Sequence, residues 1–116
     1  MPAIRTAAIA IGLLGGPLLL APCTARDLPK PVTSATVTIE GFQFQPASVL
    51  LKQGGSVTFV NKDPAPHTVT SDSKGFAGIS RLLADERKTL VLTAPGVQNY
   101  HCDIHPSMTG TITVVK

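Results

Sequence analysis

One short stretch near the C-terminus gathers side chains that bind soft metal ions. Cys102 offers a thiol, His105 an imidazole and Met108 a thioether, with two residues between each ligand and the next. His67, far upstream, offers a further imidazole. A thiolate, two imidazoles and a weakly bound thioether form the donor set of blue-copper electron-transfer sites. The residue types therefore predict one copper ion, cycling between Cu⁺ and Cu²⁺ and held by these four side chains.

Each of these residues, taken singly, has a more ordinary explanation. A lone Cys is most often a small buried apolar side chain. Met108 could belong to the core, and His67 or His105 could be a loop histidine. Together they favour a metal site, because Pro106 and the short spacing leave the loop little freedom. Zinc could occupy the same four positions in a recombinant sample without being the native metal.

No second cluster of side chains suggests catalysis. The acidic residues have no partner arrangement typical of acid–base chemistry, and we interpret them as solvated surface groups: Asp63, Asp72, Asp85 and Glu86. A copper enzyme would need a second His cluster, and a binuclear copper centre would need a second thiolate in the loop. We therefore predict that the protein is not an enzyme.

The residues around the candidate site are positioned by predicted strands. Alternation of apolar and polar residues predicts strands at 36–40, 42–44, 48–52, 56–60, 67–70, 89–93, 97–102 and 111–115. Gly54-Gly55 is a predicted turn. Residues 79–88 are interpreted as irregular, because no stop signal supports a helix there. About seven or eight short strands, with turn signals every 8–12 residues, are typical of an antiparallel sandwich or barrel.

Strand alternation also assigns faces near the site. Tyr100 and Cys102 share one face of their strand, so His101 points away from Cys102 and is expected at the surface. His67 and Val69 share a face, which we expect to be the inner one. Because His67 and Cys102 both lie where a strand meets a loop, strand pairing could bring them together.

The first 25 residues resemble a secretion signal. Arg5 supplies the positive start, residues 6–22 carry no charge, and small residues precede a cleavage point after Ala25. The uncharged run is shorter than the ~20 residues that a spanning helix needs, and Gly15-Gly16-Pro17 interrupts it. We predict removal of residues 1–25, leaving a periplasmic or secreted protein with no membrane span.

Cys23 leaves an alternative open. Leu20-Ala21-Pro22-Cys23 is similar to the lipobox of bacterial lipoproteins, although Pro22 stands where that motif has Gly, Ala or Ser. Lipidation would anchor the protein to a membrane through Cys23. Cleavage after Ala25 instead leaves Cys102 as the one thiol of the mature chain, which excludes a disulfide within that chain.

The rest of the chain, about 90 residues, suits one small domain. Residues 26–34 contain Pro29 and Pro31 and are predicted as an extended tail, followed by a domain at 35–116. The net charge of +3 is spread over scattered Lys and Arg residues, and the chain has no Trp. These features argue against nucleic-acid binding. We expect a monomer.

Several motifs together resemble the small cupredoxins of the plastocyanin and amicyanin group. They are Gly41-Phe42-x-Phe44-x-Pro46, Val60-Asn61-x-Asp63, Pro66-His67-Thr68-Val69, Ala94-Pro95-Gly96 and Tyr100-His101-Cys102-x-x-His105-Pro106-x-Met108-x-Gly110. They cover nearly all of Ala35 to Lys116, and the two-residue gap before Met108 is similar to the amicyanin loop. The resemblance implies an all-β Greek-key β-sandwich with one type 1 copper. It implies His67, Cys102 and His105 as strong ligands and Met108 as the weak axial ligand.

One position departs from the family pattern. Family members often carry Asn directly after the first ligand His, where its side chain helps to tie the two ligand loops together. This chain has Thr68 there. A Thr hydroxyl can make one such hydrogen bond, and bonds of this kind orient the ligands and tune the metal.

The resemblance implies an electron carrier that works between redox proteins outside the cytoplasm. A copper-binding protein for periplasmic storage or delivery is the alternative, because it would use the same ligands. Electrons would pass through the His105 edge to a dehydrogenase or a cytochrome-like partner. An apolar rim suited to a small, transient interface is expected around His105. Its predicted members are Ala65, Pro66, Ile104 and Pro106.

Overall fold

The computed structural model describes residues 15–16 and 28–116 of the chain. The predicted signal peptide and Cys23 therefore lie outside the described residues, except for Gly15 and Gly16. Within the described ranges the chain forms eight strands and no helix. That part of the chain accordingly holds no helix that is long and apolar enough to cross a membrane.

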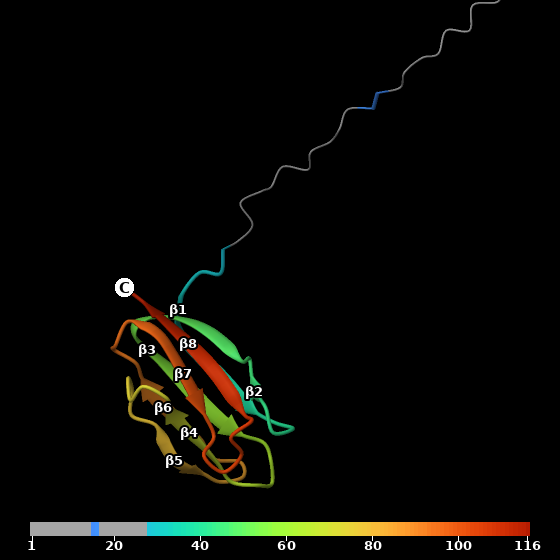
Figure 1. The fold of residues 1–116 in the computed structure, drawn as a ribbon, viewed down its shortest axis with the longest axis vertical. Coiled ribbons are helices and arrows are strands. Elements are labelled where there is room, and N and C mark those ends of the chain that lie inside the picture. The colour runs from blue at the N-terminus through green and yellow to red at the C-terminus, as the bar shows by residue number, and fades with distance from the viewer. Residues whose placement is uncertain (1–14, 17–27) are drawn as a thin grey trace, which may run out of the picture.

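The strands form one continuous sheet that folds over into two layers (Figure 1). In chain order they are β1 (Val32–Ile39), β2 (Phe44–Gln45), β3 (Ser48–Asn61), β4 (His67–Ser71), β5 (Ile79–Leu82), β6 (Arg87–Val91), β7 (Gly96–His101) and β8 (Thr109–Val115). The order across the sheet is β2-β1-β3-β8-β7-β4-β5, and β6 pairs with β3. The predicted all-β sandwich of a single domain is confirmed.

The long strand β3 joins the two layers. Its residues 48–52 pair with β8, and its residues 56–60 pair with both β1 and β6. The predicted turn at Gly54-Gly55 is wrong, because β3 continues through both glycines. Gly54 has a φ of +82°, and a Cβ on Gly55 would lie 2.8 Å from the carbonyl oxygen of Thr33. The glycines thus let the strand change partners instead of ending it.

Three further details differ from the sequence prediction. β1 pairs in parallel with β3, as does β8, so the sheet is mixed and not wholly antiparallel. β2 reverses the chain after β1, and β3 reverses it again, which aligns β3 with β1. Residues 79–88 are irregular only at 83–86, since β5 occupies 79–82 and β6 begins at Arg87. β1 begins at Val32, inside the segment predicted as a tail.

The core lies between the two layers and follows the predicted alternation. Val37 and Ile39 of β1 are fully buried. The rings of Phe44, Phe59 and Tyr100 pack edge to face, with centroids between 4.8 and 6.2 Å apart. The same buried cluster includes Cys102 and Met108. The core and the candidate site are therefore continuous.

Candidate metal centre

Three of the four predicted ligands converge at one end of the sandwich, where the loop entering β4 lies beside the loop between β7 and β8 (Figure 1). Cys102 Sγ lies 3.8 Å from Nδ1 of His67 and 4.0 Å from Nδ1 of His105. The three donor atoms all lie within 4.8 Å of one another. His67 and Cys102 are fully buried, and His105 is half-buried.

These spacings fit one metal ion placed between the three atoms. With metal–sulfur and metal–nitrogen bonds of about 2.3 and 2.0–2.1 Å, a trigonal angle of about 120° separates sulfur from nitrogen by ~3.8 Å. The observed separations of 3.8 and 4.0 Å have that size. Trigonal sites of two His and one Cys with a weak axial Met are typical of blue copper. The donor set therefore fits a single type 1 copper ion.

Met108, the fourth predicted ligand, is buried at the same end of the core. Its side chain belongs to the buried cluster that contains Cys102, and the residue is 2% exposed. The Met108 N–H donates to the carbonyl of His105 at 2.9 Å, and the Met108 carbonyl accepts the N–H of Cys102 at 3.1 Å. These two bonds close the loop into a compact turn. The structure thus places Met108 in direct backbone contact with Cys102 and His105.

Asp63 is a part of the centre that the sequence interpretation missed. The expectation of a solvated surface carboxylate is wrong, because Asp63 is 5% exposed. Its Oδ2 accepts the ring N–H of His67 Nε2 at 2.8 Å. A carboxylate on Nε2 fixes the ring orientation and leaves the Nδ1 lone pair facing Cys102. The signal was present in the Asn61-x-Asp63 motif, with His67 four residues beyond the acid.

The same carboxylate also anchors the turn between β1 and β2. Asp63 Oδ1 accepts the N–H of Gly41 at 2.8 Å, and Oδ2 accepts the N–H of Phe42 at 3.0 Å. Burial of Asp63 would raise its pKa, but the hydrogen bonds from Phe42, His67 and Gly41 outweigh burial and hold the pKa below its usual value. Asp63 is therefore an anion at neutral pH.

Asn61 holds the loop that carries His67. Its buried Nδ2 donates to the carbonyls of Ala65 and Leu82, at 2.9 and 3.0 Å. Its Oδ1 accepts the N–H of Asp63 at 2.9 Å. A buried amide with its donors and acceptor satisfied fixes the local backbone. Asn61 therefore holds Asp63, and through it His67, in place.

Thr68 links the two ligand loops, as its position after His67 predicts. The Thr68 N–H donates to Cys102 Sγ at 3.3 Å, across the two loops. The Thr68 hydroxyl accepts the N–H of Asp103 at 2.8 Å. Thr68 thus supplies a side-chain hydrogen bond between the two loops, as expected for a hydroxyl at this position, and its hydroxyl also lies 3.0 Å from that of Thr70.

His101 faces away from the centre, as strand alternation predicts. Its side chain is 31% exposed and bonds to Asp72 through Nδ1 and to Asp103 through Nε2, the latter at 2.9 Å. The hydrogen bond to Asp72, together with the one to Asp103, raises the pKa of His101. His101 is accordingly a partly exposed residue held between two carboxylates and not a candidate ligand.

Phe42 is the second feature that the sequence interpretation did not assign to the centre. Its ring centroid lies 5.5 Å from that of His67 and 4.9 Å from that of His105, edge-on in both cases. The ring is 49% exposed. The only sequence signal for it is the Gly41-Phe42 pair after the first strand.

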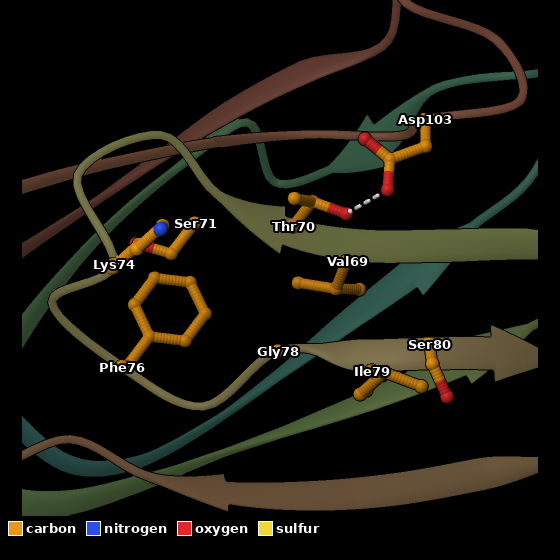
Figure 2. A pocket seen from close by; sticks show the side chains of 9 residues that line it. All are labelled: Val69, Thr70, Ser71, Lys74, Phe76, Gly78, Ile79, Ser80 and Asp103. Carbon is orange, nitrogen blue, oxygen red and sulfur yellow. Dashed lines mark hydrogen bonds between the residues drawn. The ribbon is translucent and has the colours of Figure 1, made fainter.

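A separate pocket of about 330 Å³ lies beside β4 and β5 (Figure 2). It is lined by Val69, Thr70, Ser71, Lys74, Phe76, Gly78, Ile79, Ser80 and Asp103. None of the four predicted ligands lines it. At its rim the hydroxyl of Thr70 donates to Asp103 Oδ2 at 2.8 Å. This pocket is not the metal centre.

Comparison with known families gives one match that covers most of the chain. The family model described as a cupredoxin-like domain matches residues 10–114. Amicyanin-alpha of Methylorubrum extorquens is 31% identical over 90 residues, which are 72% of this chain and 74% of that relative. Amicyanin of Paracoccus denitrificans is 28% identical over 82 residues, which are 67% of this chain and 63% of that relative.

Solved structures show the same likeness. A novel purple cupredoxin from Nitrosopumilus maritimus is 26% identical with a TM-score of 0.62, over 70% of this chain and 99% of that chain. Amicyanin from Paracoccus versutus is 26% identical with a TM-score of 0.63, over 74% of this chain and 85% of that chain. A copper-containing nitrite reductase from Thermus scotoductus is 32% identical with a TM-score of 0.63, but only 23% of that chain is covered. The likeness to the reductase therefore concerns a small part of that enzyme.

Proposed function

Because the chain belongs to the cupredoxin-like family, we propose that it is a blue-copper electron carrier, and not an enzyme, that shuttles single electrons between redox partners outside the cytoplasm. His67, Cys102 and His105 are its strong copper ligands in this proposal, and Met108 is the weak axial ligand. One observation carries the proposal: Cys102 Sγ meets two imidazole nitrogens at 3.8 and 4.0 Å.

The arrangement of these residues suits repeated electron transfer. A bound copper ion supplies a one-electron couple. The chain holds the donor atoms in place by bonds that do not involve the metal, namely Asp63 to His67 and the backbone pair between Cys102 and Met108. Since these bonds do not depend on the metal, the ligands need to move little when its oxidation state changes. Small rearrangement means a low barrier to electron transfer.

Electrons enter and leave through His105 in this proposal. His105 is half-buried, whereas His67 is fully buried, so the imidazole of His105 lies nearer to solvent. Ile104 is 50% exposed and Pro106 is exposed, while Ala65 is half-buried. An apolar rim of this kind suits a small, transient interface with a dehydrogenase or cytochrome-like partner.

An absorption spectrum of the copper-loaded protein tests the proposal. We expect an intense band near the red end of the visible spectrum, from a copper–thiolate bond, and its loss in Cys102→Ser. Asp72→Ser, a matched polar control outside the centre, should keep the band. Copper binding without this band in the unmodified chain would contradict the ligand assignment.

Copper storage or delivery remains the competing function. Complete burial of Cys102 and His67 favours retention of the metal over its release. We therefore expect fast electron self-exchange in the loaded protein and slow loss of copper to a chelator in excess. Rapid transfer of copper to an acceptor, combined with slow self-exchange, would favour delivery.

The export of the protein forms part of the same proposal. We propose that residues 1–25 are removed as a signal peptide and that the monomeric mature protein works in the periplasm or as a secreted protein, with its domain at 35–116. The alternative is a lipid anchor on Cys23. The mass of the protein recovered from its native cells distinguishes them: a chain that begins at Arg26 supports cleavage, and a diacylglycerol-modified chain that begins at Cys23 supports the anchor.

A further inference from the structure

The turn between β1 and β2 adopts a backbone conformation that is unusual for its sequence. Gly41 has a φ of +62°, which suits glycine, but Phe42 follows with a φ of +56°. Residues other than Gly, Asn and Asp rarely adopt this left-handed backbone conformation, because their Cβ crowds the following carbonyl oxygen. Such outliers persist where the surrounding structure holds them, and they cluster at functional sites.

Asp63 holds Phe42 in this conformation. Its two oxygens accept the consecutive N–H groups of Gly41 and Phe42, at 2.8 and 3.0 Å. The same Oδ2 that accepts the backbone N–H of Phe42 also accepts the ring N–H of His67, at 2.8 Å. One buried carboxylate therefore sets both the orientation of a candidate ligand and the position of the Phe42 ring.

The Phe42 ring contributes little to the core and stands at the surface, over the imidazoles. It is 49% exposed, yet it meets the rings of His67 and His105 edge-on, with centroids 5.5 and 4.9 Å away. A second pocket of about 160 Å³ borders the same ring. That pocket is lined by Phe42, Gln43, Phe44, Ala47, Ser107, Met108 and Thr109. The ring thus borders a solvent-accessible hollow that reaches Met108 and also contacts both imidazoles.

We propose that Phe42 is a shield for the metal centre, whose ring keeps water and small anionic or neutral donors in this hollow away from the imidazoles of His67 and His105. This inference rests on the proposed copper site. The Phe42 ring blocks the approach from the hollow, and Asp63 keeps the ring closed by anchoring its backbone. Without the ring, the hollow would extend to the imidazoles, and a small donor could compete with Met108, the weakest of the four candidate ligands.

Three variants distinguish the effect of the Phe42 ring from the effect of the turn that carries it. Phe42→Gly removes the ring and suits the left-handed backbone, so the loss of the side chain does not strain the turn. Phe42→Tyr keeps an aromatic ring in place. Gln43→Ala is the control, because Gln43 lines the same pocket and is exposed but carries no aromatic ring.

The first measurement is a titration of the copper(II) proteins with azide, followed by absorption and electron paramagnetic resonance. Edge-on aromatic contacts keep the ring closed, and breaking contacts of this type changes an equilibrium by about tenfold. We therefore expect Phe42→Gly to bind azide about tenfold more tightly than the unmodified protein. Phe42→Tyr and Gln43→Ala should behave like the unmodified protein.

The second measurement needs no metal. Cys102 is fully buried, so its reaction with a thiol reagent in the metal-free protein reports access to the centre. The Cys102 thiol of Phe42→Gly should react about tenfold faster than that of the other proteins, because the same ring contacts are lost in this variant. If Phe42→Gly had the azide affinity and the thiol reactivity of the unmodified protein, the shield would be overturned. It would also be overturned if Gln43→Ala raised both quantities as much as Phe42→Gly does. Absence of a copper–thiolate band in the unmodified protein would instead count against the proposed function, and the thiol assay would still decide the shield.

Discussion

Replacing Asp63 by alanine would remove one carboxylate that serves two loops. Asp63 accepts three hydrogen bonds, from Gly41, Phe42 and His67, and is 5% exposed. Alanine would leave all three donors without this partner. The two backbone groups lie near the surface, where water can replace the carboxylate, but the ring of His67 is fully buried.

The expected loss of stability follows from these environments. A stranded N–H in the fully buried ring of His67 costs about 1–3 kcal/mol, and each replaced backbone bond costs about 0.5–1.5 kcal/mol. Burial of the Asp63 carboxylate is itself unfavourable, so part of this loss is recovered. We therefore expect the free energy of unfolding of Asp63→Ala to fall by about 2–4 kcal/mol. The free energy of unfolding of Asp63→Asn, which keeps one acceptor oxygen, should lie between those of the unmodified protein and Asp63→Ala.

Urea unfolding of the metal-free protein measures this loss, and a competition titration measures the affinity for copper. Partners of ligand imidazoles contribute about 10–100-fold to metal affinity, so Asp63→Ala should weaken copper binding by a factor in that range. Glu40→Ala is a matched control, because Glu40 is an exposed acid next to the same turn. If Asp63→Ala matched Glu40→Ala in both stability and affinity, the role assigned to Asp63 would be refuted.

Three further changes test other parts of the molecule. The hydroxyl of Tyr100 is buried and has no hydrogen-bond partner among the described residues, so Tyr100→Phe should raise the free energy of unfolding by about 1 kcal/mol, measured by urea unfolding. A Cβ on Gly110 would lie 2.3 Å from the Tyr100 ring, so Gly110→Ala should destabilise the metal-free protein by about 1–3 kcal/mol, and no loss would show that the ring moves freely. Pro106→Glu places a charge on the apolar rim beside His105, so stopped-flow mixing should show slower exchange with a redox partner while the absorption band is unchanged; an unchanged rate would exclude this rim as the contact surface.

The sequence by itself determined the donor set and the class of fold. Cys102, His105 and Met108 lie within one short loop, so their proximity is a local property of the chain and can be predicted from spacing. The burial of Val37 and Ile39 is local in the same sense, because successive side chains of a strand point to opposite faces. These features need no knowledge of which strands pair.

The tertiary structure alone decided what surrounds the candidate ligands. The local motif places Asp63 near Asn61 and His67, but it does not show that the carboxylate also accepts the N–H of Gly41, which lies 22 residues away along the chain. The same holds for Phe42, whose ring reaches a candidate ligand from each of two distant loops. A carboxylate can be buried only where donors converge on it. That convergence depends on three loops meeting at one end of the sandwich. The alternation of inward and outward side chains along a strand does not reveal which loops meet.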